Sequence, residues 1–211
     1  MEDKSIVDIL LSKKAVMIDM ENLFTWSSGI KSPIYCDNRK LISYVEEREF
    51  IVNQMEIKLL QLGWDFDVVG GTATAAIPWA AFLAERLNKP MVYIRSEKKG
   101  HGAGKRIEGD IEGLKGKKVL IVEDLISTGG SSLSALEAVE EEMDSEVTGV
   151  IAIFEYGFEM AKERFKEEGV DYATLTNFEA LVALMQSRGE FDQDDVIKTV
   201  QFMRDPNNWQ S

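Results

Sequence analysis

The fold is decided by residues 117–139, which read KKVLIVEDLISTGGSSLSALEAV. The run at 119–122 is apolar throughout, as a central parallel strand buried on both faces should be. It ends in two acids, Glu123 and Asp124, and a short loop rich in glycine and hydroxyl residues follows over 125–131. Apolar residues at helical spacing come next. The pattern predicts a strand, a loop and a helix of an α/β sheet, with the loop at the carboxyl edge where ligands bind.

This loop has the composition of an anion-binding site. Glycines let backbone N–H groups approach a phosphate, hydroxyls add donors, and the following helix presents its positive N-terminal end. Glu123 and Asp124 would repel a phosphate but suit hydroxyl donors such as the vicinal diol of a ribose. The sequence contains no GxxxxGK[ST] P-loop, and HGAG at residues 101–104 has no helix pattern behind it, so it is no dinucleotide site. The loop and the acids together predict one ligand that carries both a phosphate and a ribose.

On both sides of this stretch, strand and helix patterns alternate, which predicts an α/β domain. Helices are expected over residues 3–12, 45–62, 74–87, 133–143, 158–168, 178–187 and 193–203, and Gly63 suits a C-cap. Strands are expected over residues 24–26, 34–36, 67–70, 91–94, 119–122, 147–154 and 172–175. Residues 96–109 differ from the rest, because four glycines and strong positive charge with few apolar residues predict a long surface loop.

The charge of the chain is strongly negative but unevenly spread. Its 211 residues include 24 basic and 37 acidic side chains, a net charge of −13, which argues against broad nucleic-acid binding. Residues 95–106 nevertheless hold five basic residues and one acid, a net charge of +4 that leaves −17 on the remainder. No apolar run is long enough to span a bilayer, and the N-terminus has no signal-peptide pattern. We therefore expect a cytoplasmic protein with no membrane or nucleic-acid partner.

Single residues limit the remaining possibilities. Cys36 is the only cysteine, so an intrachain disulfide and a thiolate zinc site are excluded, and a buried apolar role is expected. Because His101 is the only histidine, any metal would be bound by oxygens. The four acids within residues 140–144 are interpreted as a solvated helix end without a function. The four tryptophans are interpreted as core or interface residues, with Trp26 as the exception, and the role of the tail at 205–209 stays open.

The segment VLIVEDLISTGGSSL resembles the signature of type I phosphoribosyltransferases that binds 5-phosphoribosyl-1-pyrophosphate (PRPP). Two further segments narrow the resemblance to the orotate phosphoribosyltransferases. FTWSSGIKSPIY at residues 24–35 is similar to their N-terminal hood motif. RSEKKGHG at residues 95–102, followed by IEG at 107–109, is similar to their catalytic loop. The three motifs stand in the family's order, and the resemblance extends over about residues 5–185.

The resemblance implies the type I phosphoribosyltransferase fold, a central mostly parallel sheet flanked by helices with a small N-terminal hood. It implies a single domain over residues 1–211, with the hood at about 1–40 plus C-terminal segments and the core at about 45–175. The implied reaction joins orotate to PRPP, giving orotidine 5′-monophosphate and pyrophosphate in pyrimidine biosynthesis. The implied cofactor is Mg²⁺, held mainly by PRPP and not directly by the protein. The implied assembly is a homodimer in which the loop of one subunit closes over the site of the other.

The same resemblance assigns roles to individual residues. Lys99, His101, Glu123 and Asp124 would be catalytic, the acids by holding the ribose hydroxyls and the loop residues by neutralising the leaving pyrophosphate. PRPP would be bound by Arg95, Lys99, His101, Glu123, Asp124, Leu125, Ile126, Ser127, Thr128, Gly129, Gly130 and Ser131, and its pyrophosphate also by Thr72 and Ala73. Orotate would be bound by Ser127, Lys31 and Tyr35.

The chain departs from the better-known family pattern at four positions, where some members have lysine or arginine. These positions hold Ser27, Ala75, Ser96 and Tyr156. Their loss removes possible partners of the orotate carboxylate and leaves Lys31, Ser127 and backbone N–H groups as candidates. Two alternatives remain open: a phosphoribosyltransferase for another base, and a PRPP-sensing regulator without catalysis. The acidic charge and the absence of an added basic region disfavour the regulator.

Overall fold

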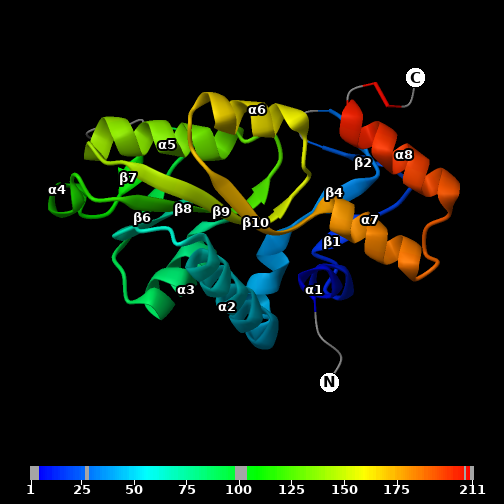
Figure 1. The fold of residues 1–211 in the computed structure, drawn as a ribbon, viewed down its shortest axis with the longest axis horizontal. Helices are drawn as coiled ribbons and strands as arrows, with labels where there is room; N and C mark the ends of the chain where they lie inside the picture. The colour runs from blue at the N-terminus through cyan, green and yellow to red at the C-terminus, as the bar shows by residue number, and fades with distance from the viewer. Residues whose placement is uncertain (1–4, 27–28, 98–103, 207, 210–211) are drawn as a thin grey trace.

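The computed structural model describes residues 5–26, 29–97, 104–206 and 208–209 (Figure 1). Its helices are α1 (Ile6–Ser12), the 3₁₀ helix η1 (Asn38–Ser43), α2 (Val45–Leu62), α3 (Ile77–Leu87), α4 (Ile111–Leu114), α5 (Gly130–Met143), α6 (Glu159–Glu167), α7 (Phe178–Ser187) and α8 (Gln193–Arg204). Its strands are β1 (Val16–Ile18), β2 (Phe24–Thr25), β3 (Lys31–Ser32), β4 (Ile34–Cys36), β5 (Val68–Thr72), β6 (Met91–Ile94), β7 (Ile107–Glu108), β8 (Val119–Ile126), β9 (Val147–Glu155) and β10 (Tyr172–Asn177).

Six strands form the central sheet in the order β10-β9-β8-β5-β6-β7. All neighbouring strands are parallel except β7, which runs antiparallel to β6. β8 lies inside the sheet, and its first four residues are fully buried. Leu120 and Val122 face one apolar cluster, whereas Val119 and Ile121 face another on the opposite side. The expected α/β fold with a mostly parallel sheet flanked by helices is confirmed.

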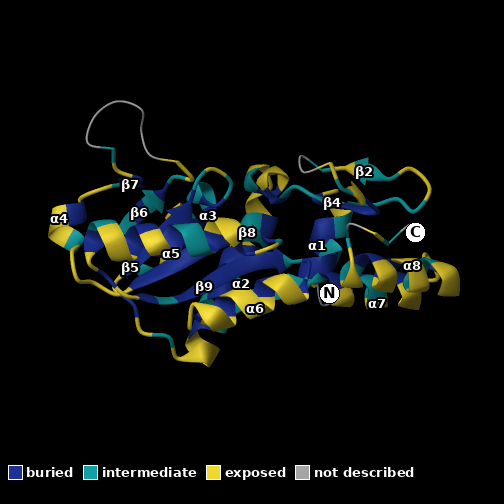
Figure 2. Ribbon diagram, turned by 90° about the horizontal axis from the view of Figure 1, so that it is seen from above, coloured by how far each residue is buried: buried dark blue, intermediate teal, exposed yellow. Residues whose placement is uncertain are grey.

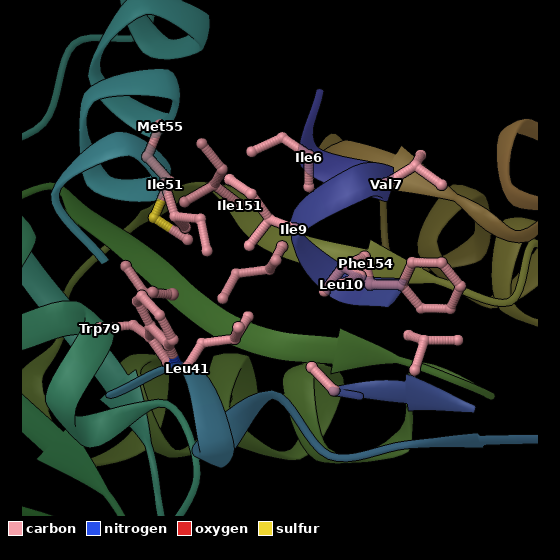
Figure 3. Close-up of a cluster of buried hydrophobic side chains, with 14 of the residues drawn as sticks. Ile6, Val7, Ile9, Leu10, Leu41, Ile51, Met55, Trp79, Ile151 and Phe154 are labelled. Atoms are coloured by element: carbon pink, nitrogen blue, oxygen red, sulfur yellow. The ribbon is translucent and has the colours of Figure 1, made fainter. Parts of the chain in front are cut away.

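Helices cover both faces of the sheet. α2 and α3 pack on one face together with α1 and α7, and α5 and α6 pack on the other (Figure 1). In the first cluster, Trp79 of α3, Met55 of α2 and Ile9 of α1 converge on the sheet, as Figure 3 shows. Each is fully buried. Figure 2 shows the buried strands between helices whose outer faces are exposed.

The hood consists of two small antiparallel sheets next to the carboxyl end of the central sheet. β1 pairs with β4, and β2 pairs with β3 in a hairpin. The pattern of this segment predicted β4 and β2, but not β1 and β3, which are only three and two residues long. Strands this short carry little periodicity, so only their partners reveal them.

The structure differs from the prediction at several boundaries, and Ile107 and Glu108 of the predicted surface loop form β7. The acid pair was expected to end the central strand, but β8 continues to Ile126, because Leu125 and Ile126 still pair with β9. The prediction that these two residues belong to the loop was therefore wrong. α3 begins at Ile77 and not at residue 74, after a turn at residues 73–76. In contrast, α2 has its expected bounds, and Gly63 ends it in the left-handed conformation with φ 66°.

Candidate active site

Glu123 of β8 is buried, with 4% of its surface exposed. Its Oε1 accepts hydrogen bonds from Thr72 Oγ1 at 2.5 Å and from the backbone N–H of Asp124 at 3.3 Å. Its Oε2 accepts hydrogen bonds from the hydroxyls of Ser131 at 2.7 Å and Ser132 at 3.3 Å. A carboxylate has about four lone-pair sites, so these bonds use its full capacity. Glu123 therefore ties β5, β8 and the first turn of α5 into one edge.

Asp124 follows directly and is half-buried. Burial raises its pKa to about 7, with a smaller contribution from the neighbouring charge of Glu123, while the nearby Arg39 lowers it. Burial also raises the pKa of Glu123, against the hydrogen bonds from Thr72 and Ser131. Two carboxylates so close favour a partner that donates hydroxyl hydrogens or develops positive charge. The ribose-binding role predicted for the pair stays a prediction.

The loop after β8 leads directly into α5. Gly129 has φ 77°, a conformation that favours glycine, and a Cβ there would lie 3.1 Å from the ring of Phe165. α5 begins at Gly130 and runs for 14 residues, so its first turn presents backbone N–H groups and the positive end of the helix dipole. Ser127 is half-buried, and Thr128, Gly130 and Ser131 are exposed. The segment has the geometry of a phosphate cradle beside the acid pair.

A second loop meets the acid pair from β5. Thr72 ends that strand and donates to Glu123, and the backbone N–H of Ala73 donates to the carbonyl of Ile94 at 2.7 Å. The peptide bond between Ala73 and Thr74 is cis. Gly71 packs under α3, where a Cβ would lie 2.7 Å from Cβ of Ala80. The structure thus brings the turn after β5 and the glycine-containing loop after β8 to the same edge of the sheet.

The two ends of the basic segment, residues 95–106, lie side by side, with the backbone N–H of Arg95 donating to the carbonyl of Arg106 at 2.9 Å. α5 holds this stem. Glu142 accepts hydrogen bonds from the backbone N–H groups of Arg106, at 2.9 and 3.0 Å, and Ile107, at 3.2 Å. The interpretation of Glu142 as part of a solvated helix end was therefore wrong. Arg106 is 7% exposed and donates to the carbonyl of Arg95 and to Ser134, so its charge serves the stem. The positive charge that residues 95–106 present to solvent is therefore smaller than predicted, because Arg106 is buried.

Three of the predicted loop and hood positions, Ser27, Lys99 and His101, lie outside the described residues. Arg95 follows β6 and lies 3.5 Å from Glu108 across the stem, measured from Nη1 to Oε1. Ser96, next to it, is exposed.

The hood contacts the acid pair through a residue that the sequence analysis missed. Asn38 is fully buried and donates from Nδ2 to the backbone carbonyl of Asp124 at 2.6 Å. Arg39 is exposed, pairs with Asp37 at 2.7 Å and lies close enough to Asp124 to lower its pKa. Both follow the hood motif directly, so the polar run after β4 was the available signal. Asn38 fixes the hood on the acid pair.

Lys31 and Tyr35, the predicted orotate-binding residues of the hood, lie on β3 and β4. Lys31 is exposed and donates from Nζ to Thr25 Oγ1 at 2.7 Å. Tyr35 is half-buried, and its ring lies 5.8 Å from that of Phe24. Tyr156, one of the four departures from the better-known family pattern, is buried and stacks on Trp26 with ring centroids 4.9 Å apart.

Among the described residues, no three His, Cys, Asp or Glu side chains gather as a metal-binding group. Cys36 is the free thiol of the chain, and burial, with the nearby Asp124, raises its pKa. Cys36 is only half-buried, packed against the first apolar cluster, so the expected buried role holds in part. No described helix is long and apolar enough to cross a membrane.

Comparison with known proteins decides the family. The model of the phosphoribosyl transferase domain matches residues 42–180. An orotate phosphoribosyltransferase of Listeria monocytogenes is 45% identical over 98% of this chain and 98% of its own length. The chain belongs to the orotate phosphoribosyltransferase family. An enzyme of that name from Staphylococcus haemolyticus is also 45% identical, over 94% of this chain and 97% of its own.

Solved structures agree with this membership. The crystal structure of the orotate phosphoribosyltransferase from Aeropyrum pernix has a TM-score of 0.75 and 29% identity, covering 89% of this chain and 99% of that one. The type I phosphoribosyltransferase fold expected from the resemblance is confirmed. The matched domain, residues 42–180, contains the acid pair and the segments that follow β5 and β8, whereas the hood strands and most of the two C-terminal helices lie outside it.

Proposed function

We propose that the protein transfers the 5-phosphoribosyl group of PRPP to orotate, as part of pyrimidine biosynthesis. The bond from ribose C1 to the pyrophosphate oxygen breaks, a bond from C1 to a ring nitrogen of orotate forms, and that nitrogen loses its proton. The products are orotidine 5′-monophosphate and pyrophosphate. The observation that carries the proposal is the acid pair, which stands between a phosphate cradle and a hood in a chain of this family.

PRPP would lie along the carboxyl edge of the sheet. Its 5′-phosphate would bind the backbone N–H groups and hydroxyls of residues 127–131 at the start of α5. Asp124 would bind the ribose hydroxyls, and its charge would stabilise the positive charge that develops on the ribose. Glu123 would support it by holding Thr72 and Ser131 in place, since its own lone pairs are already used. Thr72 and Ala73 would contact the pyrophosphate.

The basic loop would close the site. Arg95, Lys99 and His101 would neutralise the leaving pyrophosphate and exclude water from the ribosyl centre. We further propose a homodimer in which the loop of one subunit serves the site of the other. Mixed dimers of Lys99→Ala and Asp124→Asn subunits should then regain activity that each parent lacks. No activity in purified mixed dimers would show that each subunit is self-contained.

Mg²⁺ would enter with PRPP. Of the acid pair, only Asp124 would suit a hard cation, because the lone pairs of Glu123 are already used. The described residues form no metal-binding group of their own, and the cation would be held mainly by PRPP. The cation would supply charge compensation for the pyrophosphate. We propose the cytoplasm as the location, since the single cysteine suits a reducing compartment.

Orotate would bind beneath the hood. Lys31 and Ser127 are the candidates for its carboxylate, and Tyr35 for its ring. With Ala75 and Ser96 in place of lysines and Tyr156 packed in an aromatic cluster, backbone N–H groups would contribute more than in other members.

A panel of bases tests the proposed function. Purified protein with Mg²⁺ and PRPP should consume orotate, measured by its absorbance, and release an equal amount of pyrophosphate. Uracil, adenine, guanine and hypoxanthine should give less than a hundredth of that rate. Turnover of a purine without turnover of orotate would assign the enzyme to another base. Tight, salt-sensitive binding of RNA without turnover of any base would instead favour the regulator.

A further inference from the structure

The tail that follows α8 folds back onto the hood. After α8, the backbone N–H of Asn208 donates to the carbonyl of Asp205 at 3.2 Å. Nε1 of Trp209 then donates to the backbone carbonyl of Lys31 at 2.9 Å, across 178 residues of sequence. Figures 1 and 2 show α8 at the end of the molecule where the hood strands β2 and β4 lie.

The tail and the hood share one aromatic cluster. The ring of Trp209 meets Phe202 of α8 edge-on, with centroids 5.6 Å apart. Phe202, fully buried, meets Trp26 edge-on at 5.8 Å, and Trp26 stacks on Tyr156 at 4.9 Å. Nε1 of Trp26 also donates to the carbonyl of Ile34 at 3.0 Å. A continuous set of contacts therefore runs from the tail, through the hood, to the end of β9.

The hairpin depends on such contacts. β2 and β3 have two residues each, and an isolated two-stranded hairpin is marginal in water even when it is longer. Lys31 is exposed, and β3 pairs with β2 and not with any strand of the central sheet. The bond from Trp209 fixes the backbone of the one residue in this strand that carries a cation.

The two ends of this contact lie outside the shared catalytic domain. The phosphoribosyl transferase model ends at residue 180 and begins at 42, so Trp209 and Lys31 are both excluded from it. The PRPP-binding loops lie inside it. A contact that joins only the two outer segments is placed to affect the base and not PRPP.

We propose that Trp209 is a positioning residue for the base: it holds the hood hairpin so that Lys31 faces orotate. The inference rests on the proposed function and deepens it. Trp209 itself touches no substrate, and it acts through the backbone of Lys31 and the ring of Phe202.

Two variants separate the hydrogen bond from the ring contact. Trp209→Phe keeps a ring against Phe202 but removes the N–H, whereas Trp209→Ala removes both. Loss of the hydrogen bond should raise the KM for orotate roughly 2- to 10-fold, and loss of both contacts should raise it further. The KM for PRPP should stay within about 2-fold in either variant. Trp64→Phe is the matched control, because Trp64 packs on Gly149 near the start of β9, away from the carboxyl edge.

Steady-state kinetics with both substrates, together with melting temperatures, test the inference. An unchanged KM for orotate in both variants would overturn it, and so would equal increases in both KM values, which would indicate a general structural role. If the wild-type protein turns over another base and not orotate, the proposed function fails. The positioning role is then tested by the KM for that base in the same variants.

Discussion

Replacing Asp124 by asparagine should make the ligand-free protein more stable while it removes activity. Folding places Asp124 in a half-buried position beside Glu123, where the pKa of its carboxyl rises to about 7 from the ordinary 3.8. One pKa unit corresponds to about 1.36 kcal/mol, so a difference of about 3 units amounts to about 4 kcal/mol. The free energy of unfolding falls by this amount when Asp124 ionises. Asparagine has a similar shape and carries no charge at any pH.

The sign of the pH dependence follows from proton counts. Between pH 4 and pH 7 the folded protein holds more protons at this position than the unfolded chain, so stability falls as the pH rises. Most of the loss, about 2–3 kcal/mol, should develop between pH 5 and pH 8. The stability of Asp124→Asn relative to the wild type should therefore grow over that interval and level off above pH 8.

Urea unfolding at pH 5, 6, 7, 8 and 9, in EDTA and without PRPP, measures this effect. Asp171→Asn is the matched control, because Asp171 is an exposed aspartate at the start of β10. Its stability should follow that of the wild type at every pH. If the Asp124→Asn curve also runs parallel to the wild type, or if the variant is the less stable protein at pH 8, the reasoning about the acid pair is refuted.

Two further substitutions address the framework of the site. Gly71→Ala should lower the free energy of unfolding by about 1–3 kcal/mol, because its Cβ would lie 2.7 Å from that of Ala80; Gly130→Ala, whose Cβ would have no neighbour closer than 3.8 Å, should change it far less in the same urea titration. Glu142→Ala should lower kcat and cost about 1–3 kcal/mol of stability, because it leaves two backbone N–H groups at the loop stem without their acceptor. Glu141→Ala, an exposed neighbour, should leave both quantities unchanged, and equal effects of the two would contradict the role of Glu142.

Local features were predictable from the sequence. The apolar run before Glu123 identified a central strand, and the helical spacing that ends at Gly63 predicted the bounds of α2. Both patterns arise from residues that are neighbours in the sequence. The acids were predicted to end the strand since charges rarely continue one. They remain inside β8 because Thr72, 51 residues away, and the hydroxyls of α5 satisfy Glu123. The periodicity of the sequence around Glu123 cannot predict partners that come from β5 and α5.

The contacts that assemble the site are long-range and were missed for that reason. Asn38 holds the carbonyl of Asp124 across 86 residues, and Trp209 holds Lys31 across 178. Glu142 belongs to an acidic run whose composition is typical of a solvated helix end. Glu142 accepts hydrogen bonds from two backbone N–H groups only because the stem of the basic segment folds back on α5.

The central claim is that the acid pair binds the ribose of PRPP while orotate binds beneath the hood. A crystal structure of the protein with PRPP, Mg²⁺ and orotate, prepared with an inactive Lys99→Ala variant, tests it most directly. We predict ribose hydroxyls within hydrogen-bonding distance of Asp124, the 5′-phosphate on residues 127–131, and the orotate carboxylate facing Lys31 or Ser127. PRPP bound away from β8, or orotate bound outside the hood, would contradict the account.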